Sequence, residues 1–166
     1  KAGGTLVPVP GELAMPERMK LISTTAVHCL ISTPGQPWIS EQSEALVGDA
    51  TLHGNFGHTA PFDEEKLNAL NPALIRFSSG TTGRSKGVVL SHETVFARVT
   101  ACNKGLKIGP ADRVLWILPM AHHFAVSIVL YLMHGATTVL AKSHLGEDLL
   151  RELIQSRATV LYGAPF

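Results

Sequence analysis

Two hydrophobic periods alternate along most of this chain. Short, compact apolar runs, typical of buried strands, are followed by stretches with an apolar residue every three or four positions, as on one face of a helix. The strands expected on this basis are 5–10, 26–31, 73–77, 88–90, 113–118, 136–141 and 159–162. The helices expected between them are 12–24, 91–106, 124–133 and 146–156. This alternation predicts an α/β domain with a layered sheet and flanking helices.

Residues 1–33 are predicted to form one strand–helix–strand unit. The first strand stops at Pro8 and Pro10, and the helix that follows carries Pro16 in its first turn, where proline is tolerated. The second strand is 26–31. Two strands joined by a helix within so short a stretch imply parallel pairing.

Residues 34–72 carry the weakest pattern. Glycines and prolines interrupt 33–61, where we expect an irregular segment with one helical turn near 41–46. An irregular stretch of this length inside a compact domain indicates a functional loop or a crossing between subdomains. His53 and His58 have no cysteine or carboxylate beside them, and we expect them to be solvated loop residues.

Composition narrows the class of protein. Of the 166 residues, 45% are hydrophobic and 16% are charged, which excludes intrinsic disorder. The formal charge of +1 provides no broad field for nucleic acid or anionic lipid, and we expect neither as a partner. The most apolar stretch, 114–132, is interrupted by Pro119, His122 and His123, so it is predicted to be core and not a membrane span.

The cysteines and the chain ends lead to two further expectations. Cys29 and Cys102 lie far apart, without the spacing of a zinc site or a disulfide framework. We therefore expect two buried thiols in a reducing, cytoplasmic compartment. The sequence begins without methionine and ends just after an apolar run, which predicts a fragment of a longer protein.

The most specific feature is Ser-Ser-Gly-Thr-Thr-Gly-Arg-Ser-Lys-Gly at 78–87. Its glycines allow backbone N–H groups to crowd around an anion, and its hydroxyls and lysine add donors and positive charge. These are the ingredients of a phosphate cradle; a hairpin turn without a ligand is the alternative. A P-loop is excluded, because Ser85 and Gly87 stand where a glycine and a Ser or Thr belong, and the next residues favour a strand.

This segment and the Val-Val-Leu-Ser-His after it resemble the AMP-binding signature of the adenylate-forming superfamily. That superfamily includes acyl- and aryl-CoA synthetases, peptide-synthetase adenylation domains and luciferases. The departure is Ser85, where the family usually has proline, which costs the turn preorganisation but no donor. Three more segments are similar to the family: 112–122 with its Pro-x-x-His, 158–165, and the opening 2–18. The resemblance therefore covers nearly the whole chain.

The resemblance implies an ATP-dependent ligase. Such enzymes join a small carboxylic acid to the α-phosphate of Mg·ATP, release pyrophosphate, and pass the acyl group from the adenylate to a thiol. The implied cofactors are ATP, Mg and coenzyme A, and a carrier-protein thiol is the other acceptor. By position in the motif, the implied cofactor-binding residues are Ser79, Gly80, Thr81, Thr82, Gly83 and Lys86. For Lys86, a structural partnership with a carboxylate is a second interpretation.

A second implied site follows Pro119. In the family an aromatic residue or a histidine here borders the acid pocket, so His122 and His123 are the implied substrate-binding residues. Packing beside the apolar helix is the alternative for His123. Adjacent histidines cannot easily share one ion, and no metal site is expected. No Asp or Glu occurs between Arg113 and His144, which disfavours an α-amino acid and leaves aryl, fatty and other acids open.

The resemblance implies a fragment of the large N-terminal domain, with the C-terminal domain absent. Its expected pieces are the strand–helix–strand piece 1–33, the irregular crossing 34–72, and the phosphate-loop and acid-pocket piece 73–166. No catalytic residue is assigned within the fragment, because the family's later motifs lie beyond Phe166. We therefore expect the 166-residue chain by itself to have no ligase activity. A non-catalytic or degenerate nucleotide-binding module is the alternative function.

Overall fold

In the computed structural model the chain divides into two compact units. We call Gly11–Leu67 the small unit, and Lys1–Pro10 together with Asn68–Phe166 the large unit. Each unit is described by itself. The residues that the structure describes are 4–33, 42–45, 50–54, 63–78, 86–123 and 127–163.

The small unit contains a helix and an antiparallel sheet. Helix α1 (Met15–Thr24) has Pro16 in its first turn, as predicted. Strands β1 (Cys29–Ser32) and β2 (Gln42–Ala45) both pair antiparallel with β3 (Thr51–Gly54), which lies between them. Helix α2 (Glu64–Ala69) follows at the boundary with the large unit.

The parallel pairing predicted within 1–33 is wrong. Strand β1 pairs antiparallel with β3, and Leu6 instead forms a parallel bridge with Leu74 in the large unit. The Leu6 N–H donates to the Ala73 carbonyl, and the Leu6 carbonyl accepts from the Ile75 N–H, both at 2.9 Å. The local pattern identified extended segments, but the partner of a strand depends on packing that sequence periodicity does not report.

The segment 33–61 is also more regular than expected, because it supplies β2 and β3. Gln42–Ala45 is extended, so the helical turn predicted near 41–46 is wrong for these residues. Helix α2 also lies within the predicted crossing 34–72. Pairing with β3 satisfies the backbone groups of β2, whose own residues show no apolar alternation.

The large unit contains a hairpin and a parallel sheet. The hairpin joins β4 (Pro72–Ser78) to β5 (Lys86–Ser91) in antiparallel register. The parallel sheet has the order β7-β6-β8. Its strands are β6 (Arg113–Trp116), β7 (Thr137–Leu140) and β8 (Val160–Tyr162). All five strands were predicted from the sequence, and their alternation with helices confirms the α/β class.

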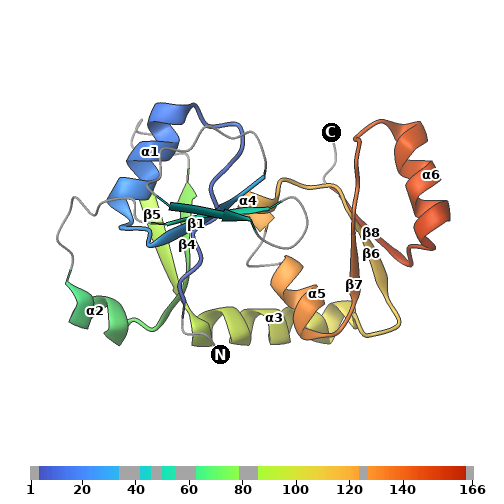
Figure 1. The fold of residues 1–166 in the computed structure, drawn as a ribbon. Coiled ribbons are helices and arrows are strands. Elements are labelled where there is room, and N and C mark those ends of the chain that lie inside the picture. Colours follow the sequence, from blue (N-terminus) through green and yellow to red (C-terminus); the bar gives the residue numbers. More distant parts are fainter. Residues whose placement is uncertain are drawn as a thin grey trace. The chain divides into compact units, whose positions relative to one another are not determined.

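Helices cover both faces of the parallel sheet. The helices of the large unit are α3 (His92–Leu106), α4 (Met120–His123), α5 (Val129–Met133) and α6 (Gly146–Ser156). Val114 and Trp116 share one face with α3 and α5, which lie beside each other (Figure 1). Leu115, fully buried, points to the other face, and α6 packs against β6.

Most of the buried apolar residues described in the large unit form one cluster. Its buried members are Val95, Val99, Ile108, Val114, Trp116, Ile128, Leu130, Tyr131 and Ala136. Several of them lie in the apolar stretch 114–132, so its buried described residues belong to the core, as predicted. Across the described ranges, no helix has both the length and the apolar character needed to cross a membrane.

Candidate functional site

The signature 78–87 lies at the turn of the β4–β5 hairpin. Ser78 and Lys86 are register partners at the ends of the two strands, so they close the base of the loop between them. The loop itself, 79–85, lies outside the described residues, and with it lie the predicted cradle residues Ser79, Gly80, Thr81, Thr82 and Gly83. The signature therefore connects two antiparallel strands, whereas a P-loop connects a strand to a helix.

Gly87, the last residue of the signature, is explained by packing. It lies opposite Phe77 in the hairpin, and a Cβ at Gly87 would lie 3.3 Å from Phe77 Cε1 and 3.6 Å from Ile75 Cγ2. The first distance is shorter than ordinary van der Waals contact between carbon atoms. Glycine at this position therefore allows the Phe77 ring to lie across the hairpin next to the base of the loop.

Lys86 is the cradle residue that the structure describes. It is the first residue of β5, and its side chain is exposed. An ammonium group carries three donors and a compact positive charge, which suits a phosphate oxygen or a carboxylate equally. Both interpretations of Lys86 therefore stay predictions.

The second candidate site lies at the carboxyl end of the parallel sheet. Strand β6 ends at Trp116, and α4 follows directly after Pro119, which brings His122 and His123 close to the end of that strand. Tyr162, the last residue of β8, is the register partner of Trp116. Open α/β sheets bind their ligands outside the carboxyl ends of the strands. The predicted acid-pocket residues thus lie at the edge where such a pocket is expected.

The ring of His123 meets two aromatic rings at steep angles. Its centroid lies 5.9 Å from that of Trp116, with an interplanar angle of 66°. It lies 6.3 Å from that of Tyr162, with an angle of 72°. The imidazole is half-buried, so it packs against the aromatic rings while part of its surface is exposed. For His122, the side chain lies outside the described residues.

The surroundings of α4 are aromatic and apolar. Trp116 is 3% exposed, and its Nε1 has no hydrogen-bond partner within the part of the chain that the structure describes. Tyr131 of α5 meets the other side of this cluster, with its centroid 6.1 Å from that of Trp116. Burial raises the pKa of the Tyr131 hydroxyl, and a hydrogen bond with Ser127 opposes that shift in part.

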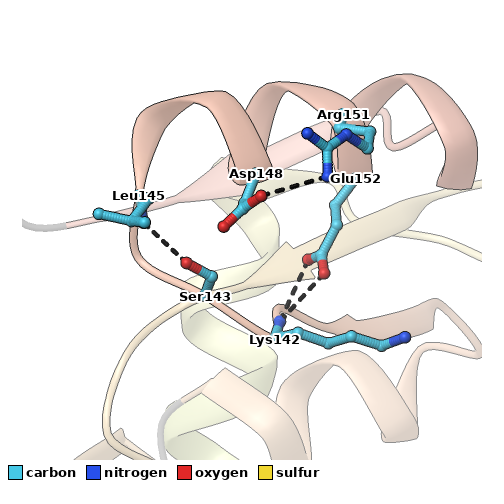
Figure 2. Close-up of polar contacts among 6 residues, drawn as sticks. All are labelled: Lys142, Ser143, Leu145, Asp148, Arg151 and Glu152. Atoms are coloured by element: carbon cyan, nitrogen blue, oxygen red, sulfur yellow. Dashed lines mark hydrogen bonds and ion pairs between the residues drawn. The ribbon is translucent and has the colours of Figure 1, made fainter.

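The loop after β7 reaches the same edge of the sheet and is fixed by α6 (Figure 2). The Lys142 N–H donates to both carboxylate oxygens of Glu152, at 3.1 and 3.3 Å. The Leu145 N–H donates to Ser143 Oγ at 3.1 Å. These bonds hold the connection from β7 to α6 in one conformation, and sequence reasoning had not identified them, because they join residues without a common motif.

Two expectations outside these sites are wrong. His53 is 7% exposed on β3, and its Nε2 lies 2.9 Å from Ser32 Oγ on β1, so it is a buried strand residue and not a solvated one. Cys29 is exposed and Cys102 is half-buried, where two buried thiols were expected. His58 lies outside the described residues. Within the described ranges, no group of three or more His, Cys, Asp or Glu side chains could hold a metal ion.

Comparison with protein families agrees with the signature and the fold. The family model described as AMP-binding enzyme matches residues 1–166. The chain belongs to this family of adenylate-forming enzymes, which confirms the resemblance found in the sequence.

The chain is similar to members of this family with different activities. Nonribosomal peptide synthetase verP of Clonostachys rogersoniana is 28% identical over 169 residues, 99% of this chain and 8% of the synthetase. Feruloyl-CoA synthase of Amycolatopsis sp is 26% identical over 171 residues, 99% of this chain and 34% of the synthase.

A solved structure gives the same picture. O-succinylbenzoate coenzyme A synthetase from Bacillus subtilis, in complex with ATP and magnesium ion, has a TM-score of 0.50 at 26% identity. The match covers 55% of this chain and 20% of that one. This chain therefore spans about a third or less of each of these relatives.

Proposed function

We propose that the chain forms the phosphate-loop and acid-pocket part of an AMP-forming acid–thiol ligase. The ligase activates a carboxylic acid as its acyl-adenylate and transfers the acyl group to a thiol. One observation carries the proposal: the signature 78–87 lies at the turn of an antiparallel hairpin, in a chain that matches the AMP-binding family over its whole length.

The donor set of the loop suits ATP. A carboxylate oxygen of the acid attacks the α-phosphorus, and negative charge grows on the departing pyrophosphate. Donors already in position stabilise that charge without reorganisation. We assign this role to the hydroxyls of Ser79, Thr81 and Thr82, to backbone N–H groups at Gly80 and Gly83, and to Lys86. Magnesium, when bound, supplies further positive charge to the phosphates.

The acid pocket is proposed to lie beside α4. His122 and His123 are the proposed contacts to the acid, because an imidazole can donate a hydrogen bond to a carboxylate and its ring can border an apolar pocket. No Asp or Glu lies between Arg113 and His144 to pair with an ammonium group. An aryl, fatty or other acid without an α-amino group therefore suits this pocket better than an α-amino acid.

Coenzyme A is the proposed acceptor. It is supported by the similarity to a feruloyl-CoA synthase over 99% of this chain. A carrier-protein thiol is the alternative, because a nonribosomal peptide synthetase is similar over the same share of the chain. We place the reaction in the cytoplasm, since Cys29 and Cys102 are both free thiols. No observation favours the alternative of a non-catalytic or degenerate nucleotide-binding module.

Acid-dependent exchange of pyrophosphate into ATP tests the proposed function in the full-length protein. The panel contains aryl, fatty and α-amino acids, each assayed with magnesium. We expect exchange with at least one aryl or fatty acid and none with the α-amino acids. Absence of acid-dependent exchange across the panel would favour a degenerate module.

The cradle assignment has its own test. Lys86→Ala and the double substitution Thr81→Ala/Thr82→Ala are expected to slow adenylate formation by about 10- to 100-fold, because each removes donors to a charged phosphate. Lys104→Ala, which removes an exposed lysine from α3 in the same unit, is the matched control and should leave the rate unchanged. Unaltered kinetics in both cradle variants would refute the assignment.

A further inference from the structure

His123 rests against a pair of rings that come from two different strands. Trp116 ends β6 and Tyr162 ends β8, and the two are direct register partners. Direct partners in neighbouring strands point to the same face of a sheet. Their rings stack with centroids 6.2 Å apart and an interplanar angle of 24°. We call this pair, Trp116 and Tyr162, the aromatic shelf.

We propose that the aromatic shelf positions His123 at the acid pocket. The inference rests on the proposed function, in which His123 contacts the acid. The imidazole meets both rings of the shelf edge-on, at 66° to Trp116 and 72° to Tyr162. A ring with one such contact can pivot about it, whereas contacts with two rings from separate strands restrict both its tilt and its position.

The burial of the two shelf residues shows which ring is held in place by the core. Trp116 is 3% exposed and is backed by Tyr131 of α5, itself 4% exposed, so the inner ring is fixed by the core. Tyr162 is 43% exposed and forms the outer ring. Because the indole Nε1 has no hydrogen-bond partner among the described residues, Trp116 acts on its neighbours through ring packing.

Helix α4 needs such support. It is four residues long, Met120–His123. A helix of a single turn is not stable by itself, because the cost of its nucleus is not offset by further hydrogen-bonded turns. The orientation of His123 therefore depends on tertiary contacts. The shelf supplies them from the carboxyl ends of two neighbouring parallel strands.

A double-mutant cycle in the full-length protein tests the proposal. Tyr162→Leu keeps an apolar side chain but removes the ring, and it should lower kcat/KM for the acid by about 3- to 10-fold through a higher KM for the acid. The KM for ATP should not change. Tyr162→Phe, which keeps the ring, should restore the original values. In a His123→Ala background, Tyr162→Leu should have no further effect, because the residue through which it acts is gone.

Leu161→Ala is the matched control. Leu161 lies on the same strand as Tyr162, and its exposed fraction, 49%, is similar to the 43% of Tyr162. Its side chain points to the opposite face of the sheet. It should leave the acid KM unchanged. If Tyr162→Leu does not fold, Tyr162→Met enters the same cycle. A Tyr162 effect of equal size with and without His123, or an equal rise in the KM for ATP, would show a structural role and overturn the proposal.

The cycle also separates this inference from the proposed function. If exchange depends on the acid and His123→Ala impairs it, but the two substitutions are additive, only the shelf is refuted. If His123→Ala leaves kcat/KM for the acid unchanged, the role of His123 in the acid pocket fails as well, and the shelf with it.

Discussion

Asp112 joins two strands at the amino edge of the parallel sheet. Its carboxylate accepts from the Gly109 N–H at 2.9 Å and from the Thr159 hydroxyl at 2.8 Å. Thr159 lies next to β8, and Asp112 directly precedes β6. Hydrogen bonds to the charged form lower the pKa of the Asp112 carboxyl, the bond from Gly109 most and that from Thr159 next.

This shift makes stability depend on pH. The pKa of Asp112 is lower in the folded chain than the unfolded value of about 3.9. Its contribution is therefore fully present above the unfolded pKa and is lost as pH falls through the folded pKa. We expect Asp112→Ala to lower the unfolding temperature near neutral pH, with the deficit shrinking below about pH 4. Thermal unfolding of both proteins over this range measures it; a deficit of constant size would contradict the linkage.

Arg157 ends α6 in the left-handed region, with φ 51° and ψ 44°. Glycine adopts this conformation without the clash of a Cβ atom. We expect Arg157→Gly to raise the free energy of unfolding by up to about 1 kcal/mol. The control is Arg151→Gly, inside the same helix, which should lower it by about 1 kcal/mol. Urea unfolding of both variants gives the two values, and a destabilised Arg157→Gly variant would contradict the strain argument.

At the scale of elements, α3 links the hairpin to the core. Ser91 is its N-cap, and Ser91 Oγ accepts from the Thr94 N–H at 3.1 Å. Ser91→Ala should lower the free energy of unfolding by about 1 kcal/mol. Ser91→Asp should restore it, because a carboxylate accepts the same bond and suits the positive end of the helix. Denaturant unfolding tests this; Ser91→Ala with unchanged stability would mean that the cap contributes nothing.

Elements with a local signal could be predicted from the sequence, and those without one could not. Gly146–Ser156 matches the expected helix residue for residue, because its apolar positions recur with the helical period. Gln42–Ala45 has no apolar alternation, and only its pairing with β3 makes it a strand. The buried position of His53 was missed for the same reason, since β3 was not recognised.

The candidate sites likewise contain features that the sequence predicted and features that it did not. The signature 78–87 and the position of His123 were evident in the sequence, because the first is itself a motif and His123 directly follows the Pro-x-x-His motif that ends at His122. The stacking of Trp116 on Tyr162 was not, because it depends on the register of two parallel strands far apart along the chain. Trp116 belongs to the segment 112–122 that suggested the acid pocket, but Tyr162 does not, and long-range pairing of β8 with β6 brings Tyr162 to His123.

At the scale of the molecule, the chain carries residues that we propose to bind ATP and the acid, but no assigned catalytic residue. It spans 34% of the feruloyl-CoA synthase that it resembles. The large unit also exposes large apolar side chains on α6, among them Leu150 and Ile154. We expect the purified 166-residue chain to show no ATP–pyrophosphate exchange with any acid. Measurable acid-dependent exchange by this chain would prove that expectation wrong.

The proposed attack of the substrate carboxylate on the α-phosphate of ATP can be tested directly by following the oxygen atoms of that carboxylate. The full-length protein is given ATP, magnesium, coenzyme A and an active acid from the exchange panel whose carboxylate carries ¹⁸O. Attack at the α-phosphorus and later cleavage of the acyl–oxygen bond by the thiol leave one labelled oxygen on AMP and none on pyrophosphate. Mass spectrometry of the two products should find that distribution. Unlabelled AMP, or label in released phosphate or pyrophosphate, would contradict the acyl-adenylate mechanism.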